Sequence, residues 1–100
     1  MSIDYSLKLT ELRKAEGLTQ RQFAEITGVS LGTIKNYESG HNVGGIATVE
    51  SVINVDRFQK YTLWLMTGNT APDAGQIEPA LSLDGPENAA TSRRSVRKTG

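Results

Sequence analysis

The segment from Gln20 to Ser39 constrains the fold of this chain more than any other part of the sequence. Its pattern predicts two short helices that cross at a steep angle through a tight turn, a geometry that restricts the residue types at a few positions. Ala24 provides the small side chain needed where the helices touch, and Gly28, four residues later, can adopt positive φ without strain. The second helix then has one apolar stripe to face inward, made of Val29, Ile34 and Tyr37.

The opposite face of the second predicted helix is small or polar. It comprises Ser30, Gly32, Thr33, Lys35, Asn36 and Ser39. A face of this kind can enter the major groove of DNA, which is about 12 Å wide. The spacing therefore indicates a DNA-binding helix-turn-helix. The alternative is a small helical bundle in which Ala24 and Gly28 serve packing alone.

Helical periodicity predicts an all-α fold of five short helices within residues 1–68. Two of these helices open with a capping box, in which the N-cap residue and the residue three positions later exchange hydrogen bonds between side chain and backbone. The boxes are Thr19–Gln22 and Asp56–Gln59. The predicted helices cover about residues 5–16, 19–28, 30–40, 48–54 and 56–68.

The composition excludes several classes of function. The chain of 100 residues has no Cys, which excludes disulfides, thiolate zinc ligands and cysteine nucleophiles. His41 is the one histidine and has no carboxylate cluster near it in the sequence, so we expect no metal site. No catalytic constellation indicates an enzyme, and we expect neither a cofactor nor a small-molecule ligand.

Hydropathy and charge bear on location and on partners. The longest apolar run, Leu63–Met66, is far too short to span a bilayer, and the polar N-terminus has no signal-peptide pattern. We therefore expect a cytoplasmic protein with no membrane partner. The 11 Lys and Arg residues balance the 11 Asp and Glu residues. A neutral monomer neutralises few phosphates, which predicts weak non-specific affinity for DNA.

Residues 69–100 are rich in small and polar residues, and we place a domain boundary near Gly68. We interpret residues 69–86 as a dimerisation segment, because apolar side chains alternate along one face of a short predicted β-strand: Ile77, Pro79, Leu81 and Leu83. Pro79 restricts that strand to a sheet edge. The alternative is that the stripe folds back on its own domain. Residues 87–100 are expected to form a disordered tail, whose basic end at 93–98 is either solvated or in non-specific contact with DNA.

Over Leu9–Met66 the chain resembles the lambda-repressor-like helix-turn-helix family, through the small residue, turn glycine and inward stripe described above. A closer resemblance, to the short C-type immunity repressors of peduovirus-like temperate phages, covers almost the whole chain. It rests on Gly28-Val29, Tyr37–Gly40, Tyr61–Thr67, Ala71-Pro72, Gly75–Ile77 and Pro79–Leu81. The loop His41–Gly45 departs from that pattern, because it has fewer Pro or basic residues than we expect there.

This resemblance implies a fold and a function. The fold would be a five-helix lambda-repressor-like domain with a short C-terminal β-strand segment. The function would be that of a sequence-specific transcriptional repressor, which maintains lysogeny by binding double-stranded operator DNA as a homodimer and blocking an early promoter. Such a protein acts in the bacterial host cell, at the nucleoid. The competing interpretation is an antitoxin-like protein whose tail binds a protein partner, although the apolar stripe of this tail is sufficient only for self-association.

Position within the motif implies roles for single residues, each weighed against an ordinary solvated side chain. The residues expected to face bases are Ser30, Leu31, Gly32, Lys35 and Asn36. Leu31 would pack on a thymine methyl group and Asn36 would pair with adenine. Gln20, at a helix N-terminus, would bind a phosphate through its backbone and side-chain amides. Weaker phosphate candidates are Arg21, Thr33, Tyr37 and Asn42.

Arg13 and Glu38 match two further positions of the wider family. There an arginine of the first helix meets an acid at the end of the recognition helix. The resemblance therefore implies a structural ion pair between Arg13 and Glu38, the alternative being that both side chains are solvated.

Overall fold

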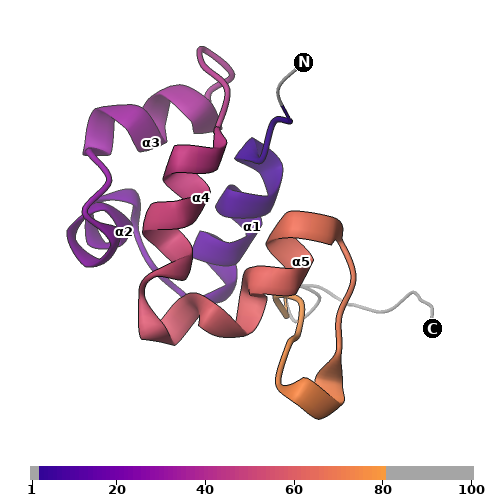
Figure 1. Cartoon of the computed structure of the whole chain (residues 1–100). Helices are drawn as coiled ribbons and strands as arrows, with labels where there is room; N and C mark the ends of the chain where they lie inside the picture. The colour runs from indigo at the N-terminus through magenta and orange to yellow at the C-terminus, as the bar shows by residue number, and fades with distance from the viewer. Residues whose placement is uncertain (1–2, 81–100) are drawn as a thin grey trace.

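A computed structural model of the chain describes residues 3–80, which are mostly helical. In chain order the helices are α1 (Ser6–Ala15), α2 (Gln20–Thr27), α3 (Leu31–Glu38), α4 (Ile46–Ile53), the 3-10 helix η1 (Asp56–Tyr61), α5 (Thr62–Thr67) and the 3-10 turn η2 (Pro72–Ala74). Figure 1 shows α2 and α3 on one side of the molecule, α1 and α4 in the middle, and α5 with the η2 turn on the other side. None of these helices is long and apolar enough to cross a membrane.

The start and end of α2 follow from local sequence signals. The predicted capping box is present, because the Gln22 N–H donates to Thr19 Oγ1 at 3.0 Å and the Thr19 N–H donates to Gln22 Oε1 at 2.9 Å. Gly28 ends the helix with φ of 81°, a backbone conformation that strains other residues. The Ser30 hydroxyl then accepts the Thr33 N–H at 3.1 Å and begins α3. The tight turn between the two helices is thus encoded locally.

The fourth helix begins at Ile46, two residues before the predicted start at Thr48. Gly45 occupies the N-cap in an extended conformation, with no side chain to cap the helix. Ile46 is 48% exposed, so the first turn of α4 does not continue the buried apolar pattern on which the prediction was based. The helix therefore extends beyond its apolar periodicity.

The prediction that residues 56–68 are helical is confirmed, but the segment is not one uniform α-helix: its first half is the 3-10 helix η1 and its second half is α5. The predicted capping box at Asp56 is also absent: Val55 is the N-cap, and no side-chain hydrogen bond caps η1. A 3-10 helix has three residues per turn, so residues three positions apart share a face. Phe58 and Tyr61 share such a face and are 0% and 4% exposed. Burial of these two rings holds η1 against the core.

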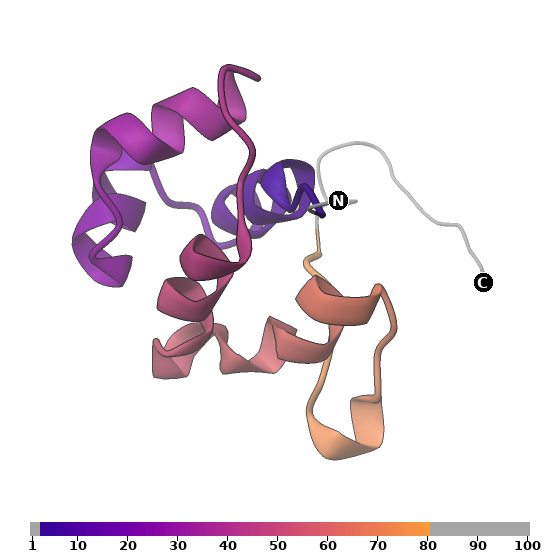
Figure 2. The same cartoon turned by 45° about the horizontal axis from the view of Figure 1, so that its top comes forward.

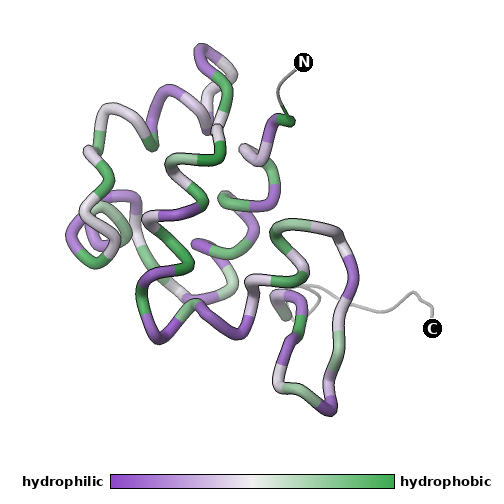
Figure 3. Tube along the Cα trace, in the orientation of Figure 1, coloured by the Kyte–Doolittle hydropathy of each residue, from purple (hydrophilic) through white to green (hydrophobic). Residues whose placement is uncertain are grey.

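The hydrophobic core draws on every α-helix and on η1. Its largest fully buried side chains are Leu9, Leu12, Phe23, Ile34, Tyr37, Val49, Val52, Phe58 and Leu65. The Phe23 and Phe58 rings pack at a centroid distance of 5.6 Å and a tilt of 47°, which joins α2 to η1. Figure 3 shows hydrophobic positions alternating with polar ones along the helices, as expected when each helix buries one face.

The predicted C-terminal β-strand is not found within residues 3–80. After α5 the chain turns through η2, and a single antiparallel bridge pairs Ala71 with Gln76. Ile77, predicted for the apolar face of the strand, is 40% exposed, and Pro79 is half-buried. Pro79 has no N–H to donate, and no neighbouring strand of the described chain can pair with residues 77–80. Leu81, Leu83 and the predicted tail 87–100 lie outside the described residues.

Candidate nucleic-acid interface

The inner face of α3 holds this helix against the rest of the domain. Ile34 and Tyr37 are buried, as is Val29 in the turn before them, and Ala24 of α2 is packed against the same core. These residues form the stripe predicted from the sequence. In Figures 1 and 2, α3 runs along the outside of the molecule next to α2. Its inner side is therefore committed to packing, and its outer side faces solvent.

The outer face of α3 carries side chains that can contact a ligand. Its exposed residues, including the N-cap, are Ser30, Gly32, Thr33, Lys35 and Asn36, whereas Leu31 is half-buried. The Lys35 and Asn36 side chains make no hydrogen bond or ion pair with other residues in the 3–80 range. A Cβ added at Gly32 would meet no atom within 4 Å. The structure thus brings together, on one open helix face, the residues expected to face bases.

The loop after α3 folds back over the last turn of the helix. The Asn36 carbonyl accepts hydrogen bonds from the His41 N–H at 2.9 Å and from the Asn42 N–H at 3.2 Å. The Ser39 hydroxyl donates to the same carbonyl at 3.2 Å. Asn42 is exposed beside the end of α3, in a position compatible with its predicted contact to a phosphate.

Gln20 and Arg21 begin α2 beside this face. The Gln20 side-chain amide donates to Glu38 Oε1 at 2.9 Å, so this amide is already occupied within the domain. Its predicted phosphate contact would therefore have to come from the backbone N–H at the helix N-terminus. Arg21 is exposed and forms no ion pair with any described residue, which leaves its guanidinium available to an anion.

Tyr37 is the one predicted DNA contact that the structure places in the core. Its side chain is 2% exposed, and its hydroxyl oxygen is buried without a hydrogen-bond partner among residues 3–80. Burial is also the main reason why the pKa of this phenol is raised. A hydroxyl in this position cannot reach a phosphate without leaving the core, so Tyr37 belongs to the packing stripe and not to the interface.

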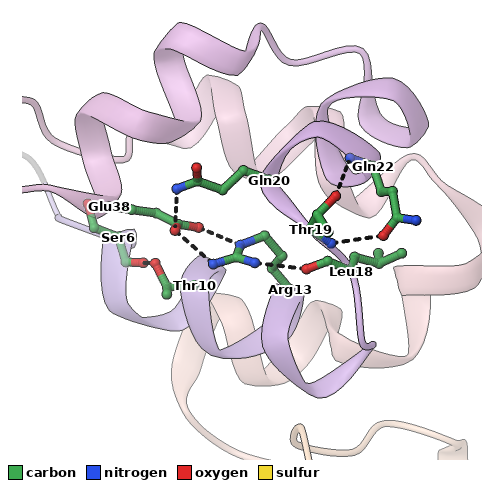
Figure 4. Close-up of polar contacts among 8 residues, drawn as sticks. All are labelled: Ser6, Thr10, Arg13, Leu18, Thr19, Gln20, Gln22 and Glu38. Atoms are coloured by element: carbon green, nitrogen blue, oxygen red, sulfur yellow. Dashed lines mark hydrogen bonds and ion pairs between the residues drawn. The ribbon is translucent and has the colours of Figure 1, made fainter.

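Arg13 and Glu38 lie at a junction of three helices (Figure 4). Arg13 of α1 donates from Nε to Glu38 Oε2 at 2.8 Å and from Nη2 to Oε1 at 2.9 Å, while Gln20 of α2 donates to the same carboxylate. Arg13 also donates from Nη1 to the Leu18 carbonyl at 2.8 Å. The side chains of the pair are only 12% and 9% exposed. This junction connects the end of α3 to α1 and α2, and so sets the orientation of α3.

The electrostatics of the face follow from this pair. Burial alone would raise the pKa of Glu38, but hydrogen bonds from Arg13 and Gln20 outweigh it and lower the pKa. The carboxylate is therefore ionised at neutral pH, with its charge compensated by Arg13. Lys35 on α3 and Arg21 at the start of α2 are exposed cations on and beside the outer face of α3, and Glu25 is an exposed acid one turn after Arg21. A chain with no net charge can thus present a locally positive face to DNA.

The residues that hold the loop after α3 were not predicted from the sequence. The Asp4 carboxylate and the Ser6 hydroxyl both accept the Gly44 N–H, at 3.2 Å and 2.9 Å, and the Gly44 carbonyl accepts the Tyr5 N–H at 2.8 Å. A Cβ at Gly44 would lie 3.0 Å from Ser6 Oγ and 3.1 Å from the Ser6 backbone N, so any other residue would force Ser6 to shift. The pair Gly44-Gly45 is the sequence feature that could have indicated a close backbone contact here, but the partner residues at the start of α1 are distant in sequence.

Comparison with known proteins agrees with this geometry. The profile of the family described as Helix-turn-helix matches residues 9–55, which span α2 and α3. The chain belongs to the lambda-repressor-like helix-turn-helix family, a class of DNA-binding transcriptional regulators. It is similar to Repressor protein C of Escherichia phage P2, with 43% identity over 100 residues covering all of both chains. It is also similar to the cryptic phage CTXphi transcriptional repressor RstR of Vibrio cholerae, with 31% identity over 90 residues, 85% of this chain and 78% of that protein.

Proposed function

We propose that this chain is a sequence-specific transcriptional repressor that inserts α3 into the major groove of operator DNA. The observation that carries the proposal is the outer face of α3, where the Lys35 and Asn36 side chains have no partner among residues 3–80 and belong to a helix held by the core and by Arg13. Base readout requires donors and acceptors held in a fixed orientation. The similarity to two proteins named as repressors supports the same function.

Within this interface we divide the contacts into two groups. Lys35 would donate to guanine and Asn36 would pair with adenine, while the half-buried Leu31 would present its remaining surface to a thymine methyl group. Phosphate contacts set the register of the protein on DNA and carry no sequence information. The residues proposed for them are Arg21, Thr33, Asn42 and the backbone N–H of Gln20.

We further propose that the repressor acts as a homodimer and maintains lysogeny by blocking an early promoter. One short recognition helix reads only a few base pairs, and the zero net charge provides little non-specific affinity. Linking two such helices makes the second contact intramolecular and can raise affinity by about 10²–10⁴. The proposed contact between copies is the segment of Ile77, Pro79, Leu81 and Leu83. Full-length similarity to a phage repressor supports the biological role.

A footprint on the DNA upstream of the chain's own gene tests this function. The full chain should protect a discrete site that overlaps a promoter, and excess random DNA should not remove the protection. A footprint that random DNA removes, or no protection at all, would contradict sequence-specific repression. Co-purification of a protein partner without any DNA protection would instead favour the antitoxin-like alternative.

A further inference from the structure

The junction between η1 and α5 interrupts the backbone hydrogen bonding of the helix. In a continuous α-helix the Leu63 N–H would donate to the Gln59 carbonyl, four residues earlier. Here the Gln76 side chain lies between these two groups: Oε1 accepts the Leu63 N–H at 2.9 Å, and Nε2 donates to the Gln59 carbonyl at 3.0 Å. A side chain inserted into the helical ladder in this way is a recognised cause of a helix break. One carboxamide thus bridges the two groups: it is the partner of the Leu63 N–H, and it adds to the Thr62 backbone N–H and hydroxyl that also donate to the Gln59 carbonyl.

The backbone around Gln76 is held at the same place. Gln76 and Ala71 exchange two backbone hydrogen bonds, of 2.8 Å and 3.1 Å, which close the loop that contains η2. The next residue, Ile77, donates its N–H to the Lys60 carbonyl at 2.9 Å. Five hydrogen bonds therefore anchor two consecutive residues, Gln76 and Ile77, to the loop and to the η1–α5 junction. The direction in which the chain leaves this anchor is fixed by the domain.

Beyond the anchor, the charge of Glu78 reaches one residue of α1. Glu78 lies close enough to Glu11 of α1 for its charge to act on that carboxyl. Ile77, whose backbone N–H belongs to the anchor, is as a residue 40% exposed. The segment proposed to bind a second copy thus starts from a defined point with an apolar side chain open to solvent.

We propose that Gln76 is a positioning residue for dimerisation, whose carboxamide fixes the exit of residues 77–80 so that a second copy meets this segment in one register. The inference rests on the proposed homodimer. A positioning role differs from a purely structural one, because the Gln76 side chain bonds to the η1–α5 junction outside α1–α4. Its loss should therefore change the placement of the segment and leave the packing of α1–α4 intact. Without this anchor, each copy would have to order its exit segment on association, and that ordering has an entropic cost.

The test compares Gln76→Ala with Gln59→Ala in the full chain. The control removes a glutamine side chain at the same junction, but it keeps the Gln59 backbone carbonyl that Gln76 uses. Gln76→Ala removes this anchor in the monomer, so each copy has to order residues 77–80 on association, and self-association should weaken by about tenfold or more as measured by sedimentation equilibrium. Affinity for a duplex with one half-site, and the helical circular dichroism signal, should stay at the level of the control. Equal dimer affinity in the two variants would overturn the inference.

Two further variants distinguish a failure of the positioning role from a failure of the proposed dimer contact. A chain truncated after Thr70 lacks the whole segment: if it still dimerises as tightly as the full chain, the proposed dimer contact itself is wrong. In Gln76→Glu, the ionised carboxylate can accept from Leu63 but cannot donate to Gln59. Protonation restores a donor, so self-association of this variant should strengthen relative to the unsubstituted chain as the pH falls. A dimer affinity that follows only the loss of helical structure, with no such pH profile, would also count against a positioning role.

Discussion

Arg13 binds Glu38 through both carboxylate oxygens, at 2.8 Å and 2.9 Å, and thereby ties the end of α3 to α1. The guanidinium donates in addition to the Leu18 carbonyl, and Gln20 donates to the same carboxylate. Two mostly buried charges held by this many hydrogen bonds form a unit, and removal of one partner leaves the other charge uncompensated.

The first prediction concerns this pair. Arg13→Ala should lower the free energy of unfolding by about 3 kcal/mol in urea denaturation, since it leaves the Glu38 carboxylate buried without its cation. Arg57→Ala is the matched control, because Arg57 pairs with Glu16 but has a side chain 44% exposed. It should cost about 1 kcal/mol or less. Replacement of Arg13 and Glu38 together by apolar residues should cost less than Arg13→Ala alone. An unchanged midpoint in Arg13→Ala would contradict the role given to the pair.

The second prediction concerns Glu11, whose pKa is raised by partial burial and then by the charge of Glu78. The folded state therefore binds this proton more tightly than the unfolded state, so ionisation at neutral pH destabilises the fold. Glu11→Gln should raise the melting temperature slightly at pH 7. The difference should close as the pH falls toward the unfolded pKa of about 4.3. Glu50→Gln, at an exposed site on α4, is the control. A difference that grows in acid would show that the sign is wrong.

The third prediction separates stability from binding at Gly32. This residue lies within α3, and a Cβ there would have open space. Since alanine is a better helix former, Gly32→Ala should stabilise the fold by up to about 1 kcal/mol. The same methyl group would stand between the helix and the base edges, so operator affinity should fall. Thermal melts and operator titrations measure the two effects. A variant that binds the operator as well as the unsubstituted chain would show that Gly32 does not lie where α3 approaches the base edges.

Local signals were sufficient to predict the helix-turn-helix. The Thr19–Gln22 capping box, the positive φ of Gly28 and the buried stripe of Val29 and Ile34 depend on residues within a few positions of one another. Tyr37 shows the limit of reasoning by position. It was assigned both to the inward stripe and to phosphate binding, and its burial in the core is compatible only with the first role.

Contacts between distant segments could not be predicted from the sequence. The predicted helix over 56–68 is interrupted by the side-chain carboxamide of Gln76, thirteen residues beyond Leu63. No local sequence pattern predicts that insertion. The hydrogen bond from Gln20 to Glu38 and the one from the Gly44 N–H to Ser6 are likewise tertiary contacts. In each case a residue type common in loops or helices gains its role from a partner that periodicity does not identify.

Base readout by Asn36 is the central claim, and one measurement tests it most directly: the affinity of Asn36→Ala for the footprinted operator and for random duplex DNA. Asn54→Ala, which removes an exposed asparagine at the end of α4, is the control. Loss of a bidentate contact to adenine should cost about 1–3 kcal/mol on the operator and much less on random DNA, while the control should bind both as the unsubstituted chain does. Equal losses on the two DNAs would show that Asn36 contacts only the backbone, and no loss on either would remove Asn36 from the interface and contradict the claim.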